Sequence, residues 1–331
     1  MTALPETMQG FIVREFGGPE NMRRETLPVP SPGPGQVLVA VHASGMNFAE
    51  TRMRDGSYSG QPLPFVMGME GAGTVAAIGD GVDGFAVGDR VFGRARGCHA
   101  EFVVFDAVHL MPLPDRLSFE EGAAIPVGWL TAWHALHTVA GLQAGQRVLI
   151  EAVAGSVGSA ALQIAREAGC WTAVTASSSD KLAPARAAGA DLAINYLDAS
   201  ISERVREATD GAGVDVSLMT VGQPTAQALF DSMGMDGKVV MFGSTGGKDI
   251  TFNLAIGIVN MQLLSMSIST SPAYLTHTLP QFRAEALPRF ANGRFVPVVD
   301  TVLPLEELAH AHAMIGMRRH YGKIILQVRP D

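Results

Sequence analysis

The hydrophobic positions of this chain follow one rhythm up to about Pro126 and another after it. In the first part, short apolar runs are separated by Gly and Pro, which is the pattern of brief strands joined by tight turns. The close spacing of these runs predicts a mostly antiparallel, barrel-like β domain. The strands expected there are residues 37–43, 73–78, 90–92 and 100–105.

After Pro126, short apolar runs alternate with segments of helical spacing. In one of these segments Val157, Ala161, Ile164 and Ala168 fall on one face of a 3.6-residue repeat. Such alternation predicts an α/β Rossmann domain, a doubly wound parallel sheet with helices on both faces. The five strands expected are residues 147–152, 171–175, 192–196, 214–219 and 238–243.

The length of 331 residues fits two domains. The last part of the chain predicts a helix over 279–290, an extended segment over 297–303 and a closing strand over 323–328. These elements are too few for a third domain, so we expect them to pack on the first. The predicted domains are therefore residues 1–127 with 271–331, and residues 128–270.

Composition excludes several classes of protein. Apolar residues make up 47% of the chain and the net charge is -8, so a folded globular protein is expected, with neither nucleic acid nor membrane as partner. Cys98 and Cys170 form no CxxC pair, which argues against a disulfide framework and fits the cytoplasm. No signal peptide or membrane-spanning segment is expected.

A glycine-rich turn between the first Rossmann strand and its helix suits a pyrophosphate, because backbone N–H groups and the positive helix end converge there. Relative to the pattern GxGxxG the first Gly is missing. Gly155 allows the phosphates close to the backbone, and Gly158 allows the helix close to the strand. A plain tight turn is the alternative. The residues expected to hold the cofactor here are Ala152, Gly155, Ser156, Val157 and Gly158.

The end of the second Rossmann strand predicts NADPH as the cofactor. An acid about 20 residues beyond the turn would bind the ribose 2′-hydroxyl of NAD, but this strand ends in Ala and Ser. Ser177 leaves room for a 2′-phosphate and Lys181 offers it a cation. In the alternative interpretation Asp180 caps the next helix and Lys181 is solvated.

Taken together, the chain resembles the zinc-free quinone oxidoreductase (zeta-crystallin-like) branch of the medium-chain dehydrogenase/reductase superfamily. The resemblance implies that the first domain is GroES-like and catalytic. The AxxGxxG form of the turn is typical of this branch. The matching stretches are residues 16–20, 43–47, 54–58, 68–73, 87–91, 131–132, 152–158, 188–190, 194–196 and 322–323.

The same resemblance predicts that no zinc is used. Zinc-dependent members bind the metal through a Cys and through the His of a Gly-His-Glu motif, and those positions hold Asn47 and Met69, an amide and a thioether. Without a Lewis acid, alcohol oxidation is disfavoured, and hydride transfer from NADPH to a quinone or an α,β-unsaturated carbonyl is expected. Three two-ligand pairs fall short of a zinc site: Cys98/His99, His134/His137 and His310/His312.

The resemblance also assigns residues to the site. Asn47 would hold substrate or ribose, and Tyr58 would donate a hydrogen bond or proton or else form an aromatic wall. Lys323 would reach a cofactor phosphate or be a surface lysine. Further cofactor contacts expected are Thr131, which could instead cap its helix, Tyr196, Phe242 and Gly243. An apolar acceptor pocket is expected from Met46, Met69, Phe92, Trp129 and Met266, some of which would be plain core.

Two other functions remain open. An enoyl-thioester reductase acting on a CoA or carrier-protein substrate would need a basic patch, for which Arg52, Arg54, Arg94 and Arg96 are candidates. A protein that binds NADPH without turnover, in a structural or regulatory role, is the second. Resemblance further suggests a homodimer formed by edge strands of the Rossmann sheets through residues 261–268, which could instead be a strand inside one subunit.

Overall fold

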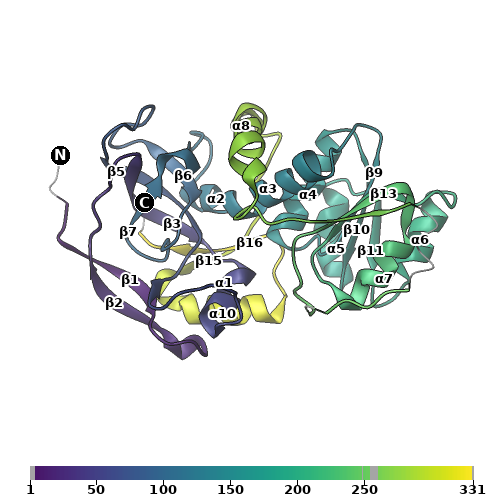
Figure 1. Ribbon diagram of the computed structural model, residues 1–331, viewed down its shortest axis with the longest axis horizontal. Coiled ribbons are helices and arrows are strands. Elements are labelled where there is room, and N and C mark those ends of the chain that lie inside the picture. Colours follow the sequence, from purple (N-terminus) through teal and green to yellow (C-terminus); the bar gives the residue numbers. More distant parts are fainter. Residues whose placement is uncertain (1–3, 248, 254–259, 330–331) are drawn as a thin grey trace. The chain divides into compact units, whose positions relative to one another are not determined.

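The computed structural model describes residues 4–247, 249–253 and 260–329 (Figure 1). The chain forms two compact units, Met1–Val127 with Leu287–Asp331, and Gly128–Ala286. The units divide at Val127 and at Ala286, whereas the predicted domains divide at residues 127 and 270.

Side-chain contacts explain why residues 271–286 belong to the second unit. The Thr278 hydroxyl contacts His134 Nδ1 at 2.5 Å, and Trp133 Nε1 donates to Gln281 Oε1 at 3.2 Å. The Trp133 ring also meets Phe282 edge-on, with 5.6 Å between centroids. A helical pattern in the sequence predicts a helix but does not tell which unit its buried face joins.

The second unit is built on one parallel sheet of six strands in the order β11-β10-β9-β12-β13-β14. Counted along the chain this order is 3-2-1-4-5-6, which is the Rossmann arrangement and confirms the predicted fold. The sixth strand, β14, lies at the outer edge of the sheet and within residues 261–268. The strands are β9 (Arg147–Ile150), β10 (Trp171–Ala176), β11 (Leu192–Asn195), β12 (Val214–Met219), β13 (Met233–Met241) and β14 (Gln262–Ser265).

Helices connect each of the strands from β9 to β13 to the next one (Figure 1). Of the face that the helical spacing predicts, Ala161 and Ile164 of α4 are buried, whereas Val157 and Ala168 are partly exposed. The helices of this unit are α4 (Ser156–Glu167), α5 (Ser179–Ala187), α6 (Ile201–Ala208), α7 (Gln223–Asp231) and α8 (Leu279–Gln281), with π-helical turns η3 (His134–Val139), η5 (Tyr274–Thr278) and η6 (Phe282–Ala286). The helix α3 (Pro126–Trp133) begins two residues before the unit does.

The first unit is mostly antiparallel and is organised by β3 (Gln36–Gly45), which pairs with β5, β7 and β16. A β-carbon at Gly73 would lie 2.0 Å from Ala40 O, so the close approach of β5 to β3 requires a glycine. The other strands are β1 (Thr7–Val13), β2 (Met22–Pro28), β4 (Phe65–Val66), β5 (Glu70–Ile78), β6 (Arg90–Arg94), β7 (Phe102–Asp106), β8 (Leu110–Pro112), β15 (Val299–Pro304) and β16 (Lys323–Gln327).

The end of the chain completes this unit, as the sequence predicts, because Ile325 of β16 pairs with Gly45 of β3. One core of the unit joins Phe11 and Val13 of β1 to Leu308 and Ile315 of α10. Within the described ranges, no helix has the length and apolar character needed to cross a membrane. The remaining elements are α1 (Phe48–Asp55), α2 (Phe119–Ala123), α9 (Leu287–Ala291), α10 (Leu308–Met317), η1 (Pro19–Asn21), η2 (Ala107–His109) and η7 (Leu305–Glu307).

Candidate functional site

The glycine-rich turn follows β9, at the point where the strand order of the sheet reverses. In open α/β sheets ligands bind at this switch point, outside the carboxyl ends of the strands. Ala152 has a φ of 53°, a left-handed conformation that costs an L-residue about 1 kcal/mol. Its carbonyl accepts the N–H of Gly155 at 2.9 Å, which closes the turn. Such strain is typically kept at ligand sites.

The two glycines of the turn have different reasons to be glycine. A β-carbon at Gly158 would lie 2.5 Å from Ala152 O and 2.7 Å from Val153 Cα, so the helix could not approach the strand. Gly155 has a φ of −79°, and the nearest atom to a β-carbon there would be Ala152 O at 3.4 Å. A side chain at residue 155 would therefore meet no close atom of the described residues. The space beside Gly155 is open to a ligand.

The start of α4 offers backbone donors. Gly155 is the N-cap and has no side chain that could accept the first-turn N–H groups, which belong to Ser156, Val157 and Gly158. The first backbone bond of the helix runs from Ser159 N to Gly155 O at 2.9 Å. Donors at the positive end of a 12-residue helix fit a pyrophosphate.

Ser177 and Lys181 meet beyond the end of β10. Lys181 Nζ donates to Ser177 Oγ at 3.2 Å, so a hydroxyl and an ammonium face the same place. Ser178 is the N-cap of α5, with its hydroxyl accepting Lys181 N–H at 3.4 Å. The alternative in which Asp180 caps this helix is therefore wrong.

The other predicted cofactor contacts of the sheet lie at its carboxyl edge. Tyr196 N donates to Ala176 O at 3.2 Å, and Phe242 N donates to Met219 O at 3.1 Å. A β-carbon at Gly243 would come within 2.5 Å of the Thr220 hydroxyl oxygen. These residues follow β11 and β13 on the same edge as the turn after β9.

The sequence did not indicate Glu151, the residue after β9. Its Oε2 accepts the N–H groups of Thr220 and Val221, each at 2.6 Å, and its Oε1 accepts the Thr225 hydroxyl. The side chain is buried, and burial raises the pKa of Glu151 above its usual range although these hydrogen bonds lower it in part. Glu151 thereby fastens the loop after β12 to the phosphate-binding turn.

Thr131, Trp129 and Met266 were predicted near the nicotinamide or the acceptor. Thr131 lies in the last turn of α3 and not at the start of a helix, so its alternative role as a cap is wrong. Thr131 and Trp129 are buried. Met266 is partly exposed after β14, with its N–H donated to Met241 O at 2.9 Å.

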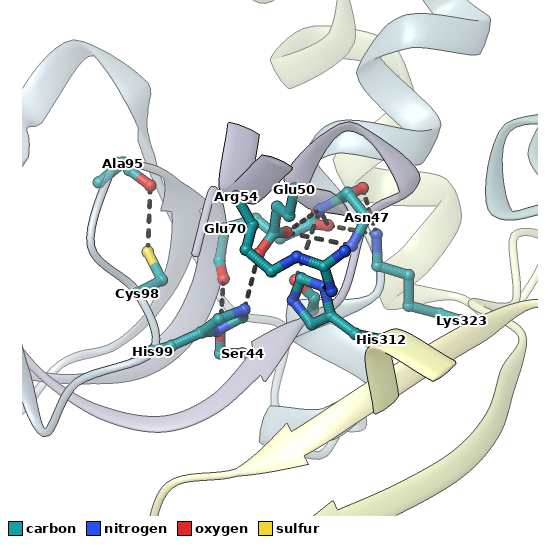
Figure 2. A network of polar contacts seen from close by, with 11 residues as sticks. Ser44, Asn47, Glu50, Arg54, Glu70, Ala95, Cys98, His99, His312 and Lys323 are labelled. Carbon is teal, nitrogen blue, oxygen red and sulfur yellow. Dashed lines mark hydrogen bonds and ion pairs between the residues drawn. The ribbon is translucent and has the colours of Figure 1, made fainter. Parts of the chain in front are cut away.

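In the first unit Asn47 lies at the centre of a buried polar network (Figure 2). It is the N-cap of α1 and forms a capping box with Glu50. Its Nδ2 donates to Glu70 Oε1 at 2.7 Å and to Glu50 Oε1 at 3.1 Å, and its Oδ1 accepts from Lys323 Nζ at 2.7 Å. Both amide hydrogens are used, so Asn47 can only accept a further hydrogen bond.

Glu70 and Lys323 form an ion pair inside this network (Figure 2). Their side chains are 0% and 1% exposed, and the second oxygen of Glu70 accepts Val127 N–H at 2.6 Å. The alternative of Lys323 as a surface lysine is therefore wrong. Its contact with a cofactor phosphate stays a prediction, and it would require the ammonium to turn away from Glu70.

The remaining predicted residues of this unit divide by burial. Met46 and Phe92 are 2% and 0% exposed and Met46 belongs to a core cluster, so they form core rather than an open pocket wall. Met69 and Tyr58 are partly exposed. Tyr58 lies in the loop after α1, where its N–H donates to Arg52 O at 2.9 Å.

The described ranges contain no group of three or more His, Cys, Asp or Glu side chains that could hold a metal ion. Each of the three pairs considered in the sequence has a member with another contact. Cys98 donates to Ala95 O and His99 pairs with Glu50. His134 contacts Thr278, and His312 contacts Arg54. The sequence did not indicate Glu50 or Glu70 as site residues, and Lys323 was expected at a cofactor phosphate rather than beside Asn47. A capping-box pattern at Asn47 and Glu50 was the available signal.

Two family models match the chain. One is described as "Alcohol dehydrogenase GroES-like domain" and matches residues 33–115, and the other is described as "Zinc-binding dehydrogenase" and matches residues 156–287. The second range includes neither Asn47 nor Met69. The first match confirms that the β-rich unit is GroES-like.

Individual relatives extend over nearly the whole chain. Quinone oxidoreductase of Rattus norvegicus is 33% identical, over 96% of this chain and 97% of its own. A mycocerosic acid synthase-like polyketide synthase of Mycolicibacterium smegmatis is 34% identical over 97% of this chain, which is 15% of its own length. A mycobacterial protein solved in complex with NADPH is 30% identical, with a TM-score of 0.89 over 97% of this chain and 100% of that one.

The Rossmann unit with its phosphate-binding turn and the GroES-like unit with its buried network define a class of protein. The chain is an oxidoreductase of the medium-chain dehydrogenase/reductase superfamily, which uses a nicotinamide dinucleotide. Within that superfamily it belongs to the quinone oxidoreductase branch, as the sequence motifs predict.

Proposed function

We propose that the chain is a zinc-independent reductase that transfers a hydride from NADPH to a quinone or an α,β-unsaturated carbonyl. The ion pair of Lys323 with Glu70 carries this proposal. Zinc enzymes of the superfamily use a Cys and a Gly-His-Glu motif here, whereas this chain has Asn47 and Met69. An ammonium already neutralises the buried acid of the motif. A metal cation beside that ammonium would be repelled by it.

In this proposal the side chains of the site support hydride transfer without a metal. A bound NADPH supplies a hydride, and an electron-poor acceptor then needs only hydrogen bonds for the charge it develops. In this proposal Tyr58, whose side chain is partly exposed, donates one. Asn47 accepts from a hydroxyl of ribose or substrate, which is supported by the contacts of its amide hydrogens with Glu50 and Glu70.

NADPH rather than NADH is supported by Ser177 and Lys181. The hydroxyl and the ammonium converge beyond β10, where the ribose of the cofactor is expected. A related protein binds NADPH. Charge-assisted hydrogen bonds to a phosphate are the strong ones, so Lys181 would contribute much of the discrimination.

Substitution of Lys181 tests this cofactor preference. We expect K181A to raise the KM for NADPH about tenfold, since a hydrogen bond to a charged group contributes about 1.5 kcal/mol or more. The KM for NADH should not change. Arg186→Ala is the control, because it removes a cation from the same helix. The guanidinium of Arg186 donates to Ala193 O, so we expect neither the KM for NADPH nor the KM for NADH to change. An unchanged KM for NADPH in K181A would refute the assignment.

An enoyl-thioester reductase is the second candidate, and the resemblance to a polyketide synthase favours it. Of the four arginines considered, Arg96 is exposed and donates to Gln61 Oε1 at 2.8 Å, in the loop that carries Tyr58. Arg54 instead donates to Gly17 O at 3.1 Å. NADPH consumption measured over quinones, enones and enoyl-CoAs distinguishes the two reductases.

The same measurement tests the third candidate. NADPH binding without turnover of any acceptor would favour a structural or regulatory protein.

We also propose that the chain is a cytoplasmic homodimer. Both cysteines, Cys98 and Cys170, are free and buried thiols, which fits a reducing compartment.

A further inference from the structure

Glu50, His99 and Ser44 form a chain of contacts behind Asn47 (Figure 2). His99 Nε2 and Glu50 Oε2 form an ion pair at 2.7 Å, with both side chains 0% exposed. His99 Nδ1 contacts Ser44 Oγ at 2.7 Å. These side chains come from β3, α1 and the segment before β7, so only the fold brings them together.

The hydrogen bonds around His99 imply that Glu50 and His99 share one proton. Ser44 Oγ donates its only proton to the carbonyl of Glu70 at 3.0 Å, so the ring must donate to Ser44 through Nδ1. The Nε2 contact with Glu50 then holds a second proton. Burial raises the pKa of Glu50, but the charge and hydrogen bond of His99 outweigh burial and the pKa is lowered. The carboxyl of Glu50 and the ring of His99 therefore share this proton across their 2.7 Å contact, and the pair carries no net charge.

Another imidazole faces Glu50 but does not take this role. His312 of α10 lies beside Arg54, with 3.4 Å between Nδ1 and the guanidinium. Burial lowers the pKa of His312 to about 3, and the ring is therefore neutral at physiological pH. His99 is the imidazole that contacts Glu50 Oε2, at 2.7 Å.

The other oxygen of Glu50 fixes the direction of Asn47. Glu50 Oε1 accepts the backbone N–H of Asn47 at 3.0 Å and its side-chain Nδ2 at 3.1 Å. Because carboxylates only accept, Glu50 and Glu70 turn the amide nitrogen toward themselves and the amide oxygen toward Lys323. The contact of His99 with Glu50 Oε2 holds the second oxygen of the same carboxylate.

We propose that Glu50 and His99 are positioning residues, which hold the Asn47 amide so that its oxygen faces Lys323 and the hydroxyl of a bound ligand. The inference rests on the proposed function, in which Asn47 accepts from ribose or substrate. Stability alone does not explain the pair, because apolar side chains of similar volume are often as stabilising as a buried ion pair. Orientation of a functional amide explains why charges are buried here.

Three variants separate positioning from stability: His99→Gln, Glu50→Gln and the double variant Glu50→Gln/His99→Gln. H99Q removes the imidazole from Glu50 Oε2, and the double variant removes the carboxylate of Glu50 as well. We expect the thermal midpoint to fall in H99Q and to recover in the double variant. We expect kcat to fall about tenfold in H99Q and to stay low in the double variant, because the amide that E50Q introduces can turn its nitrogen toward Asn47.

His134→Gln is the matched control. It removes another buried imidazole that contacts a hydroxyl, Thr278 Oγ1, in the other unit. We expect it to lower the thermal midpoint and to leave kcat unchanged. If kcat of the double variant returns together with its thermal midpoint, Glu50 and His99 are merely structural and the inference is wrong.

Nuclear magnetic resonance of the Asn47 side-chain amide tests the same inference without turnover. We expect the two amide protons of Asn47 to give separate signals in the wild type and to shift in both single variants. Unchanged signals in H99Q would overturn the inference even if the protein consumes NADPH. Absence of NADPH consumption with shifted signals would instead count against the proposed function alone.

Discussion

At the scale of single residues, Asn47 was predicted as a site residue but its surroundings were not. Its partners Glu50, Glu70 and Lys323 lie 3, 23 and 276 residues away along the chain. Only the first separation leaves a sequence pattern, the capping box. The structure adds that both amide hydrogens of Asn47 are used internally, so its chemistry toward a ligand is that of an acceptor.

Glu151 gives a prediction about pH. Its folded-state pKa is raised, mainly by burial, so between the usual value near 4.3 and the raised value the folded protein binds more protons than the unfolded chain. Stability should therefore fall as pH rises through this interval. Glu151→Gln keeps an oxygen that can accept from Thr220 and Val221 but cannot titrate. We expect urea unfolding of E151Q to show a shallower fall between about pH 4 and pH 7.

Glu207→Gln is the control for this measurement, since the Glu207 side chain is 69% exposed. It should leave the pH dependence of the unfolding free energy as in the wild type. Identical pH profiles for E151Q and the wild type would mean that the pKa of Glu151 is not raised in the folded protein.

At the scale of elements, the phosphate-binding turn shows how two glycines of one motif differ. Gly158→Ala would place a β-carbon 2.5 Å from Ala152 O, and we expect it to lower the free energy of unfolding by about 1–3 kcal/mol. Gly155→Ala meets no atom of the chain closer than 3.4 Å, so its stability should be nearly that of the wild type. Its affinity for NADPH should fall, because a methyl group enters the space beside the N-terminus of α4.

Denaturant unfolding and NADPH titration of both variants check this contrast. The two substitutions are matched controls for each other, since each adds one methyl group to the same turn. Unimpaired NADPH binding by a folded G155A protein would show that the phosphates do not approach the backbone at Gly155.

At the scale of the whole molecule, β14 is the element that bears on assembly. It pairs with β13 on one side and forms the outer strand of the sheet, with Leu263 46% exposed. Outer strands with exposed apolar side chains pair readily with another chain. We expect light scattering to give the mass of a dimer, and Leu263→Lys to shift the mass toward that of a monomer.

Leu275→Lys is the control for this substitution, because Leu275 is also 46% exposed but lies in the π-helical turn η5. It should leave the mass unchanged. A monomeric mass for the wild-type protein would rule out the proposed dimer, and a dimeric mass for L263K would place the interface elsewhere.

The sequence by itself determined the elements and the type of fold. Apolar patterns depend on local geometry, so short apolar runs predicted the strands and a 3.6-residue repeat predicted a helix, and the turn at Gly155 and Gly158 predicted a dinucleotide. The placement of residues 271–286 and the sixth strand of the Rossmann sheet did not follow from those patterns. Each depends on which distant surface an apolar face meets.

Tertiary structure alone decided the environment of the charged groups. Nothing local in the sequence distinguishes Glu70 and His99 from residues exposed to solvent. The resemblance singles out Lys323 and a capping box singles out Glu50, but neither pattern predicts burial in a polar network. Their burial is possible because partners from separate elements contact them, since an unpaired buried charge costs several kcal/mol. Pairing across the fold therefore determines which hydrogen bonds Asn47 can still form. The sequence predicts, by resemblance, only that Asn47 stands where zinc enzymes have a Cys.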